Sequence, residues 1–161
     1  SLGQLVVRGS KDAIDDLEEG RREVKGRSLG LPVSGTFRSP RMEDAARTFG
    51  KAINSIKNTA WHDAAFAIYC NADPAPLRDA GAIKEMMIRQ MTSSVFWIDT
   101  ITRQWDNGCR LFVECGPKGV LSRMTGPILQ EHGPASEART DETPSWFSVN
   151  VGNMRAAEEF R

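Results

Sequence analysis

The sequence predicts a mixed α/β fold, because short apolar stretches alternate with amphipathic helical patterns along the chain. Ala65–Cys70 has the length and composition of a buried strand, and Leu111–Val113 is wholly apolar, as central strands of parallel sheets are. Apolar residues recur at helical spacing after Asp79, from Ile83 to Met91, and again from Trp97 to Asn107. Strands that alternate with helices are typical of α/β proteins.

The first 35 residues predict a small β-α-β unit. Leu5–Val7 is a short apolar run that Gly9 ends, and Ser10 is a suitable N-cap for a half-exposed helix. The strand-like run Leu29–Val33 follows that helix. A strand this close to Ser1 suggests that the start of the chain is a cut rather than a natural terminus.

A second helix start follows at Ser39-Pro40, where a capping hydroxyl precedes a proline that suits the first helical position. Its apolar stripe is spaced for one buried face and comprises Met42, Ala45, Ala46, Phe49, Ile53 and Ile56. Arg38 is therefore expected on a loop directly before a helix N-terminus. Side chains at such junctions are often held at the mouth of a site.

The remaining chain is predicted to contain connections and one last apolar run. Asn71–Pro76 holds two prolines and is expected to be a turn-rich connection, and Gly116–Gly119 turns the chain into a further helix. Residues from about 130 to 144 are polar and predict a surface loop. Trp146–Val149 then predicts a last strand.

Composition excludes several classes of function. The chain has 161 residues, with 21 basic and 21 acidic side chains, a balance that does not favour nucleic acid or a membrane surface. No apolar run approaches the roughly 20 residues that span a bilayer. The three cysteines show no metal-ligand spacing, so we expect them to act as small hydrophobic residues in a reducing, cytoplasmic protein, and we expect no metal.

Several separated segments resemble the motifs of one enzyme family. Leu31-Pro-Val-Ser-Gly-Thr-Phe-Arg-Ser-Pro-Arg-Met42 resembles Leu-Pro-Val-Ser-x-x-Phe-His-Ser-Pro-x-Met, and Val113–Leu121 resembles Glu-x-Gly-Pro-x-x-Val-Leu. Ile88–Trp97 resembles Val-Arg-Gln-Leu-x-x-Pro-Val-x-Trp. Weaker matches are Ser1–Gln4, Ile68–Asn71 and Phe147–Val151. In this order the motifs are similar to those of malonyl-CoA:acyl carrier protein transacylases.

The resemblance implies a fold made of two subdomains. Residues 1 to about 35 would be part of the family's ferredoxin-like small subdomain. Residues 36–161 would be the C-terminal part of its α/β-hydrolase-like large subdomain. The family's nucleophilic serine lies in a Gly-His-Ser-x-Gly segment of the preceding half, and its carboxylate-binding arginine lies there too. No Gly-His-Ser segment occurs in this chain.

The family's reaction moves malonyl from malonyl-CoA, its substrate, through an acyl-serine to the phosphopantetheine thiol of acyl carrier protein. This transfer serves fatty acid or polyketide synthesis, and no bound cofactor is implied. A histidine acts as the base, and a backbone carbonyl orients it. The resemblance assigns the base position to Arg38, the carbonyl to Gln90 and a pocket position to Val33, although a core valine is the simpler interpretation of Val33.

Arg38 is a departure from the family's chemistry, because a guanidinium stays protonated and has no acceptor. Three interpretations follow: a non-catalytic or impaired homologue, an anion-binding arginine in an altered site, or an isolated substitution in an active enzyme. His62 and His132 are poor replacements, since one precedes a strand and the other lies in the polar stretch.

Three hypotheses about the whole chain remain open. The first is the C-terminal portion of a transacylase-like protein that is inactive alone. The second is a non-catalytic module that binds a carrier protein or another partner, and the third is a fragment of a proteolysed protein. A truncated α/β sheet exposes apolar edges, so we also expect self-association or pairing with the missing half.

Overall fold

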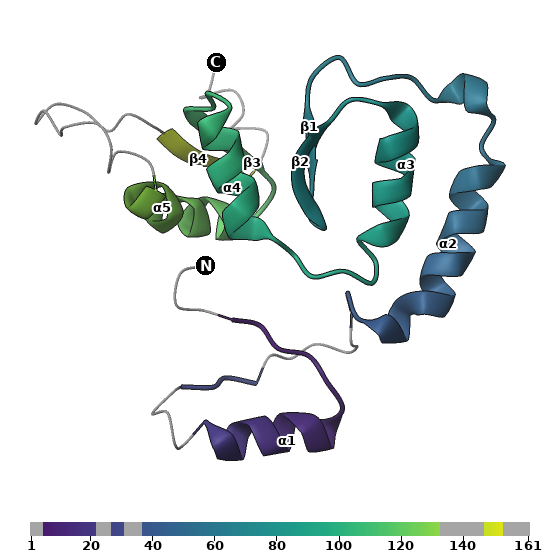
Figure 1. The fold of residues 1–161 in the computed structure, drawn as a ribbon. Helices are drawn as coiled ribbons and strands as arrows, with labels where there is room; N and C mark the ends of the chain where they lie inside the picture. Colours follow the sequence, from purple (N-terminus) through teal and green to yellow (C-terminus); the bar gives the residue numbers. More distant parts are fainter. Residues whose placement is uncertain (1–4, 22–26, 31–36, 133–146, 153–161) are drawn as a thin grey trace, which may run out of the picture. The chain divides into compact units, whose positions relative to one another are not determined.

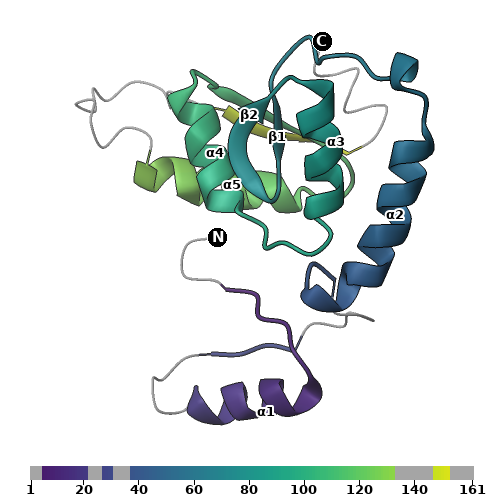
Figure 2. The same ribbon diagram turned by 45° about the vertical axis from the view of Figure 1, so that its right-hand side comes forward.

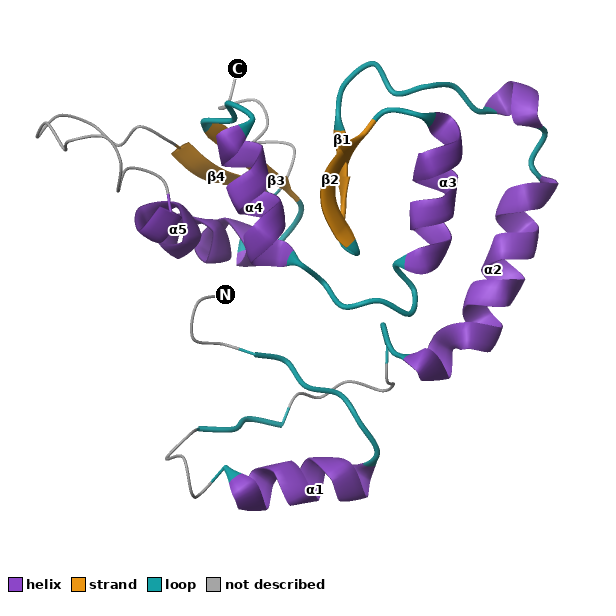
Figure 3. Ribbon diagram, viewed as in Figure 1, coloured by secondary structure: helices purple, strands orange, loops and turns teal. Residues whose placement is uncertain are grey.

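The computed structural model describes residues 5–21, 27–30, 37–132 and 147–152, and its elements are mixed α and β (Figure 3). The chain divides into two compact units. The N-terminal unit comprises Leu5–Ala72 and Pro76–Val95. The described residues of the C-terminal unit are 96–132 and 147–152, with Asp73–Ala75. The mixed α/β class predicted from the sequence is therefore confirmed.

The predicted β-α-β unit is present only in part. Helix α1 spans Lys11–Gly20, and its N-cap Ser10 accepts a hydrogen bond from the Ala13 amide at 3.3 Å. Residues Leu5–Val7, expected as a strand, form none and are exposed. A strand needs a hydrogen-bonded neighbour, and the described residues offer none here. Val33 and most of the second expected strand lie outside the described residues.

The helix expected after Ser39 begins with a 3-10 turn, η1 (Pro40–Met42), and continues as α2 (Glu43–Ser55). The Ser39 side chain makes no capping hydrogen bond, so proline at the first position supplies the start signal. The predicted apolar stripe buries Ala46 and Ile53. After α2, a second 3-10 turn, η2, spans Asn58–Ala60.

Strand β1 (Ile68–Cys70) is shorter than the predicted run and pairs with β2 (Asp73–Leu77) in a two-stranded sheet. The prediction of a turn-rich connection over Asn71–Pro76 is wrong for most of its length, because only two residues separate the strands. Proline is tolerated in a strand where its missing N–H faces no partner, as in a small sheet with open edges.

Helix α3 (Ala80–Arg89) follows β2, and the predicted cap Asp79 accepts a hydrogen bond from the Ala82 amide at 2.7 Å. Helices α2 and α3 run side by side in both ribbon views (Figures 1 and 2). A Cβ built on Gly50 of α2 would meet Cδ1 of Ile88 of α3 at 3.4 Å, so glycine permits this close approach.

The C-terminal unit places two helices over a two-stranded parallel sheet. Helix α4 spans Trp97–Asp106 and helix α5 spans Val120–His132, three residues into the stretch expected as a loop. Strand β3 (Leu111–Cys115) pairs in parallel with β4 (Phe147–Val151). The core of this unit is formed by Ile101, Trp105, Ile128 and Leu129. Phe112 of β3 packs against that core, so α4 and α5 cover the Phe112 face of the sheet.

Candidate functional site

Arg38 lies on the loop that leads into η1 and α2. Its φ of 57° is in the left-handed region, which residues other than glycine rarely adopt. Ser39 then returns to extended backbone, and its carbonyl accepts a hydrogen bond from the Met42 amide at 2.9 Å. Arg38 thus lies on a loop directly before a helix, as the sequence predicted, and it is partly buried.

The Arg38 guanidinium contacts the end of α3. Its Nη1 donates a hydrogen bond to the backbone carbonyl oxygen of Gln90 at 3.2 Å. Gln90 is the C-cap residue of α3, where carbonyl groups lack partners within the helix and a cation is favourable. The structure thus brings together the two residues that the resemblance singled out. The catalytic roles assigned to them remain predictions.

The packing of α2 on α3 supports this contact. Arg38 lies just before η1, which leads directly into α2, and Gln90 directly follows the last turn of α3. The close approach at Gly50 and Ile88 joins these two helices within the same unit. The contact between Arg38 and Gln90 therefore depends on the packing of α2 on α3 as well as on the loop that carries Arg38.

The chemistry open to this pair is limited by the guanidinium. It has donors in a planar fork and no acceptor, so it binds carbonyl, carboxylate or phosphate oxygens and cannot take a proton from a serine. His62 is exposed in the segment before β1, and His132 is the last residue of α5. Within the C-terminal unit, the His132 ring lies against Asp106 of α4.

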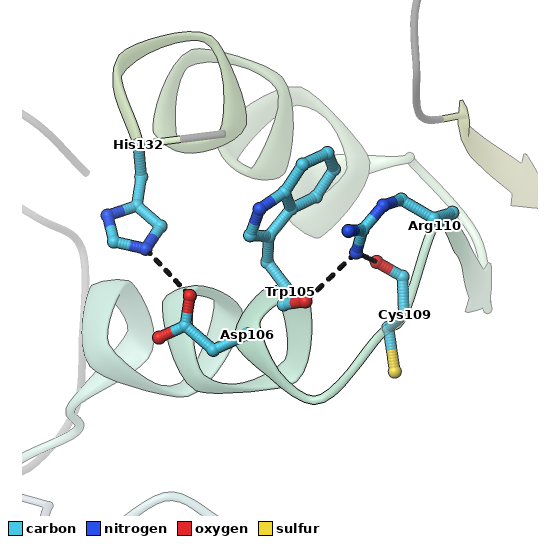
Figure 4. A network of polar contacts seen from close by, with 5 residues as sticks. All are labelled: Trp105, Asp106, Cys109, Arg110 and His132. Carbon is cyan, nitrogen blue, oxygen red and sulfur yellow. Dashed lines mark hydrogen bonds and ion pairs between the residues drawn. The ribbon is translucent and has the colours of Figure 1, made fainter. Parts of the chain in front are cut away.

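The residues around His132 form a polar network at the end of α4 (Figure 4). His132 Nε2 lies 3.1 Å from Oδ1 of Asp106. Arg110 stacks on the Trp105 ring, 3.7 Å from its centroid, and donates to the carbonyl oxygens of Trp105 and Cys109. The Cys109 thiol points away from the histidine and aspartate, so the network closes the end of α4 and does not form a nucleophilic triad.

The turn between β3 and α5 is held by Glu114. Its Oε2 accepts hydrogen bonds from the Ser122 amide at 2.8 Å and the Ser122 hydroxyl at 2.9 Å. The Ser122 amide, followed by further backbone and hydroxyl donors, lowers the pKa of the Glu114 carboxyl despite partial burial. Asn150 of β4 donates to the carbonyl of Gly116 at 2.7 Å. The Gly116–Gly119 turn is thus a braced strand-to-helix connection.

The sequence also contains a pattern that the family motifs do not include. Gly26-Arg27-Ser28-Leu29-Gly30 fits the general Gly-x-Ser-x-Gly form. Such an elbow places its serine between a strand and a helix, with a histidine as base. Ser28 lies instead in irregular chain, is exposed, and donates to a carboxylate oxygen of Glu18 at 3.5 Å. Its local structure therefore does not match a nucleophile elbow.

The described residues contain neither a metal centre nor a membrane span. No group of three or more histidine, cysteine, aspartate or glutamate side chains among them could hold a metal ion. No described helix is both long and apolar enough to cross a membrane.

Comparison with known proteins points to one family. A malonyl-CoA:acyl carrier protein transacylase of Staphylococcus aureus is 33% identical over 150 residues, which are 89% of this chain and 46% of that protein. Over this part of its length, the chain is similar to the malonyl-CoA:acyl carrier protein transacylase family. A transacylase of Synechocystis is 30% identical over 122 residues, covering 75% of this chain and 40% of that protein. The chain therefore spans less than half the length of these relatives. No protein-family model matches it.

Solved structures of transacylases share the fold over the same fraction. An acyl carrier protein S-malonyltransferase of Vibrio cholerae aligns with a TM-score of 0.77 and 23% identity, covering 95% of this chain and 45% of its own. A malonyl-transacylase solved in complex with a type II polyketide acyl carrier protein aligns with a TM-score of 0.75 and 21% identity, covering 92% and 43%. At these identities the likeness shows the fold alone.

Proposed function

We propose that this chain is the C-terminal portion of a transacylase-like protein that moves malonyl from malonyl-CoA to the phosphopantetheine thiol of acyl carrier protein. In this proposal Arg38 occupies the position of the histidine base, Gln90 supplies the orienting carbonyl, and Val33 lines the acyl pocket. The serine nucleophile comes from the part of the protein outside this chain. Three free cysteine thiols favour a reducing, cytoplasmic setting.

The observation that carries the proposal is the 3.2 Å hydrogen bond from Arg38 Nη1 to the Gln90 carbonyl. A carbonyl oxygen accepts a hydrogen bond from a guanidinium or from an imidazole N–H that reaches it. An imidazole would donate one N–H to it and keep the other nitrogen as an acceptor for the serine proton. The guanidinium satisfies the carbonyl but has no second function as a base, so we infer an impaired enzyme.

The transfer itself needs a proton to leave the serine as its oxygen attacks the thioester carbonyl, and to return to the departing CoA thiolate. General acid–base catalysis contributes roughly 10²–10⁴-fold to such steps. A protein that carries Arg38 should therefore transfer malonyl slowly, and Arg38→His should recover a large part of that factor.

A thioester-exchange assay with malonyl-CoA and carrier protein tests this. Four proteins are compared: this chain, the longer protein that contains it, and that protein with Arg38→His or Arg41→His. Arg41→His adds an imidazole at an exposed position of η1, three residues away, and controls for a general effect of histidine. We expect roughly a 100-fold gain or more from Arg38→His alone. Full activity with Arg38 in place would refute the impaired-enzyme proposal.

A second candidate is a non-catalytic module that binds carrier protein. The donor-only chemistry of Arg38 favours it, because a guanidinium suits recognition of a phosphate or carboxylate better than proton transfer. Titration of isotopically labelled chain with carrier protein, followed by amide NMR, tests this candidate. An unchanged spectrum at saturating carrier protein would exclude it.

A further inference from the structure

The guanidinium of Arg38 has an edge that its contact with Gln90 does not use. Among the described residues, the side chain makes one hydrogen bond, from Nη1 to the Gln90 carbonyl, and the ion pairs involve other side chains. Nε and Nη2 are not among the buried unpaired atoms of this part of the chain, so both are accessible. These two nitrogens carry parallel N–H groups, which is the arrangement that binds the two oxygens of a carboxylate.

The backbone and helix α3 restrict the direction of this edge. The left-handed φ of 57° at Arg38 lies directly before η1, and the far end of the side chain is held at the C-cap residue of α3. All these elements belong to the N-terminal unit. A planar fork that is already held at one nitrogen loses less freedom on binding than an unattached side chain does.

The charges around the contact favour an anion. Arg41 of η1 and Arg89, the residue before Gln90, are exposed and take no part in the ion pairs of the described residues. The first turn of α2 carries two acidic residues, of which Asp44 already pairs with Arg47 at 2.9 Å. The electrostatic potential at the open edge is therefore positive, which attracts a negative ligand.

We propose that the Nε and Nη2 edge of Arg38 binds a carboxylate that carries a single negative charge. The C-terminal end of α3 has a partial negative charge, and its Gln90 carbonyl already contacts the guanidinium. One carboxylate balances the positive charge that remains. A phosphate dianion places a second negative charge beside the same helix end, where it is repelled.

The ligand class that fits is a short acyl group with a free carboxylate, such as the malonyl group of a malonyl thioester. This identification rests on the proposed function, whereas the carboxylate site itself rests on contacts within this chain. In this role Arg38 holds the carboxylate at the position of the family's base and accepts no proton. The substitution thus replaces proton transfer at this position by binding.

Titration of the unmodified chain with monomethyl malonate tests the site, with chloride used to keep the ionic strength constant. This probe carries one carboxylate, as a malonyl thioester does, and dimethyl malonate is its neutral counterpart. We expect the monoester to shift the Nε–H resonance of Arg38 in the isotope-edited NMR spectrum and the diester to leave it unchanged. Inorganic phosphate should bind at least about tenfold more weakly than the monoester.

Two variants separate the fork from its charge. Arg38→Lys keeps the positive charge and loses the two parallel donors, so it should weaken binding at least about tenfold. It also assigns the Nε–H resonance, which it removes. Arg41→Gln is the control, because it removes an exposed charge of η1 and keeps the fork. It should weaken binding less than about twofold, since exposed charges are screened by salt.

Several results overturn the proposal. These are an Nε–H resonance that the monoester does not shift, an equal shift with the diester, tighter binding of phosphate, and equal weakening by the two variants. The measurement on the unmodified chain does not depend on the folding of any variant. The transfer assay with Arg38→His separates this proposal from the catalytic one. A gain in transfer without binding of the monoester refutes the carboxylate site alone, and binding without a gain refutes the catalytic proposal alone.

Discussion

Replacing Arg38 by alanine is expected to loosen α2 from α3. The change removes the hydrogen bond to the Gln90 carbonyl, a bond with a charged donor on a partly buried side chain. Hydrogen bonds to charged groups contribute about 1.5–3 kcal/mol when buried, so we expect a loss of roughly 1–2 kcal/mol at this site. The left-handed backbone of residue 38 remains in the alanine variant, which keeps its strain.

Arg38→Gly separates the hydrogen bond from the strain. Glycine loses the same hydrogen bond, but it adopts a φ of 57° without a Cβ clash. The glycine variant should therefore be about 1 kcal/mol more stable than the alanine variant. If the backbone of residue 38 relaxed on substitution, this difference would disappear.

Hydrogen exchange of the α2 amides is the appropriate assay, because the chain has two units and local opening need not follow global unfolding. A change of about 1.4 kcal/mol alters a local opening constant tenfold. Arg47→Ala is the control, since its ion pair with Asp44 on the same helix is exposed and contributes at most about 1 kcal/mol. Equal exchange in the alanine and glycine variants, or no change in either, would refute the reasoning.

Three further predictions concern the C-terminal unit. The pKa of Glu114 is lowered in the folded protein, so its carboxylate stabilises the fold at pH values above the ordinary carboxyl pKa of 4.5. This stabilisation is lost as the pH falls from 4.5 through the lowered pKa. Glu114→Gln should therefore make stability depend less on acid pH, as measured by a circular dichroism titration. Leu129→Ala, at a residue with 0% exposure, should lower the free energy of unfolding by about 2–5 kcal/mol in urea titrations, and a smaller loss would mean that the core is not closed there. Asp106→Asn breaks an exposed pair with His132 and should lower stability by less than about 1 kcal/mol; a larger loss in the same titrations would contradict a surface role.

Helices were predictable from the sequence because their signals are local. Asp79 and the apolar spacing after it predicted α3, and the Trp97, Ile101 and Trp105 spacing predicted α4 to within one residue at its end. Strands were less predictable, since each depends on a partner far along the chain. Leu5–Val7 has strand composition but no described partner, whereas Asp73–Leu77 pairs with β1 despite two prolines.

The sequence by itself determined the resemblance to the transacylase motifs and the presence of arginine at position 38, because both are properties of residue type and order. The resemblance already pointed to Arg38 and Gln90 together, but only the tertiary structure decided that Nη1 of Arg38 donates to the Gln90 carbonyl at 3.2 Å, and that it does so from a left-handed backbone. The physical reason is that this contact depends on how α2 packs on α3, through side chains such as Ile88 against Gly50. The order of residues along the chain does not by itself give the distance between Arg38 and the Gln90 carbonyl.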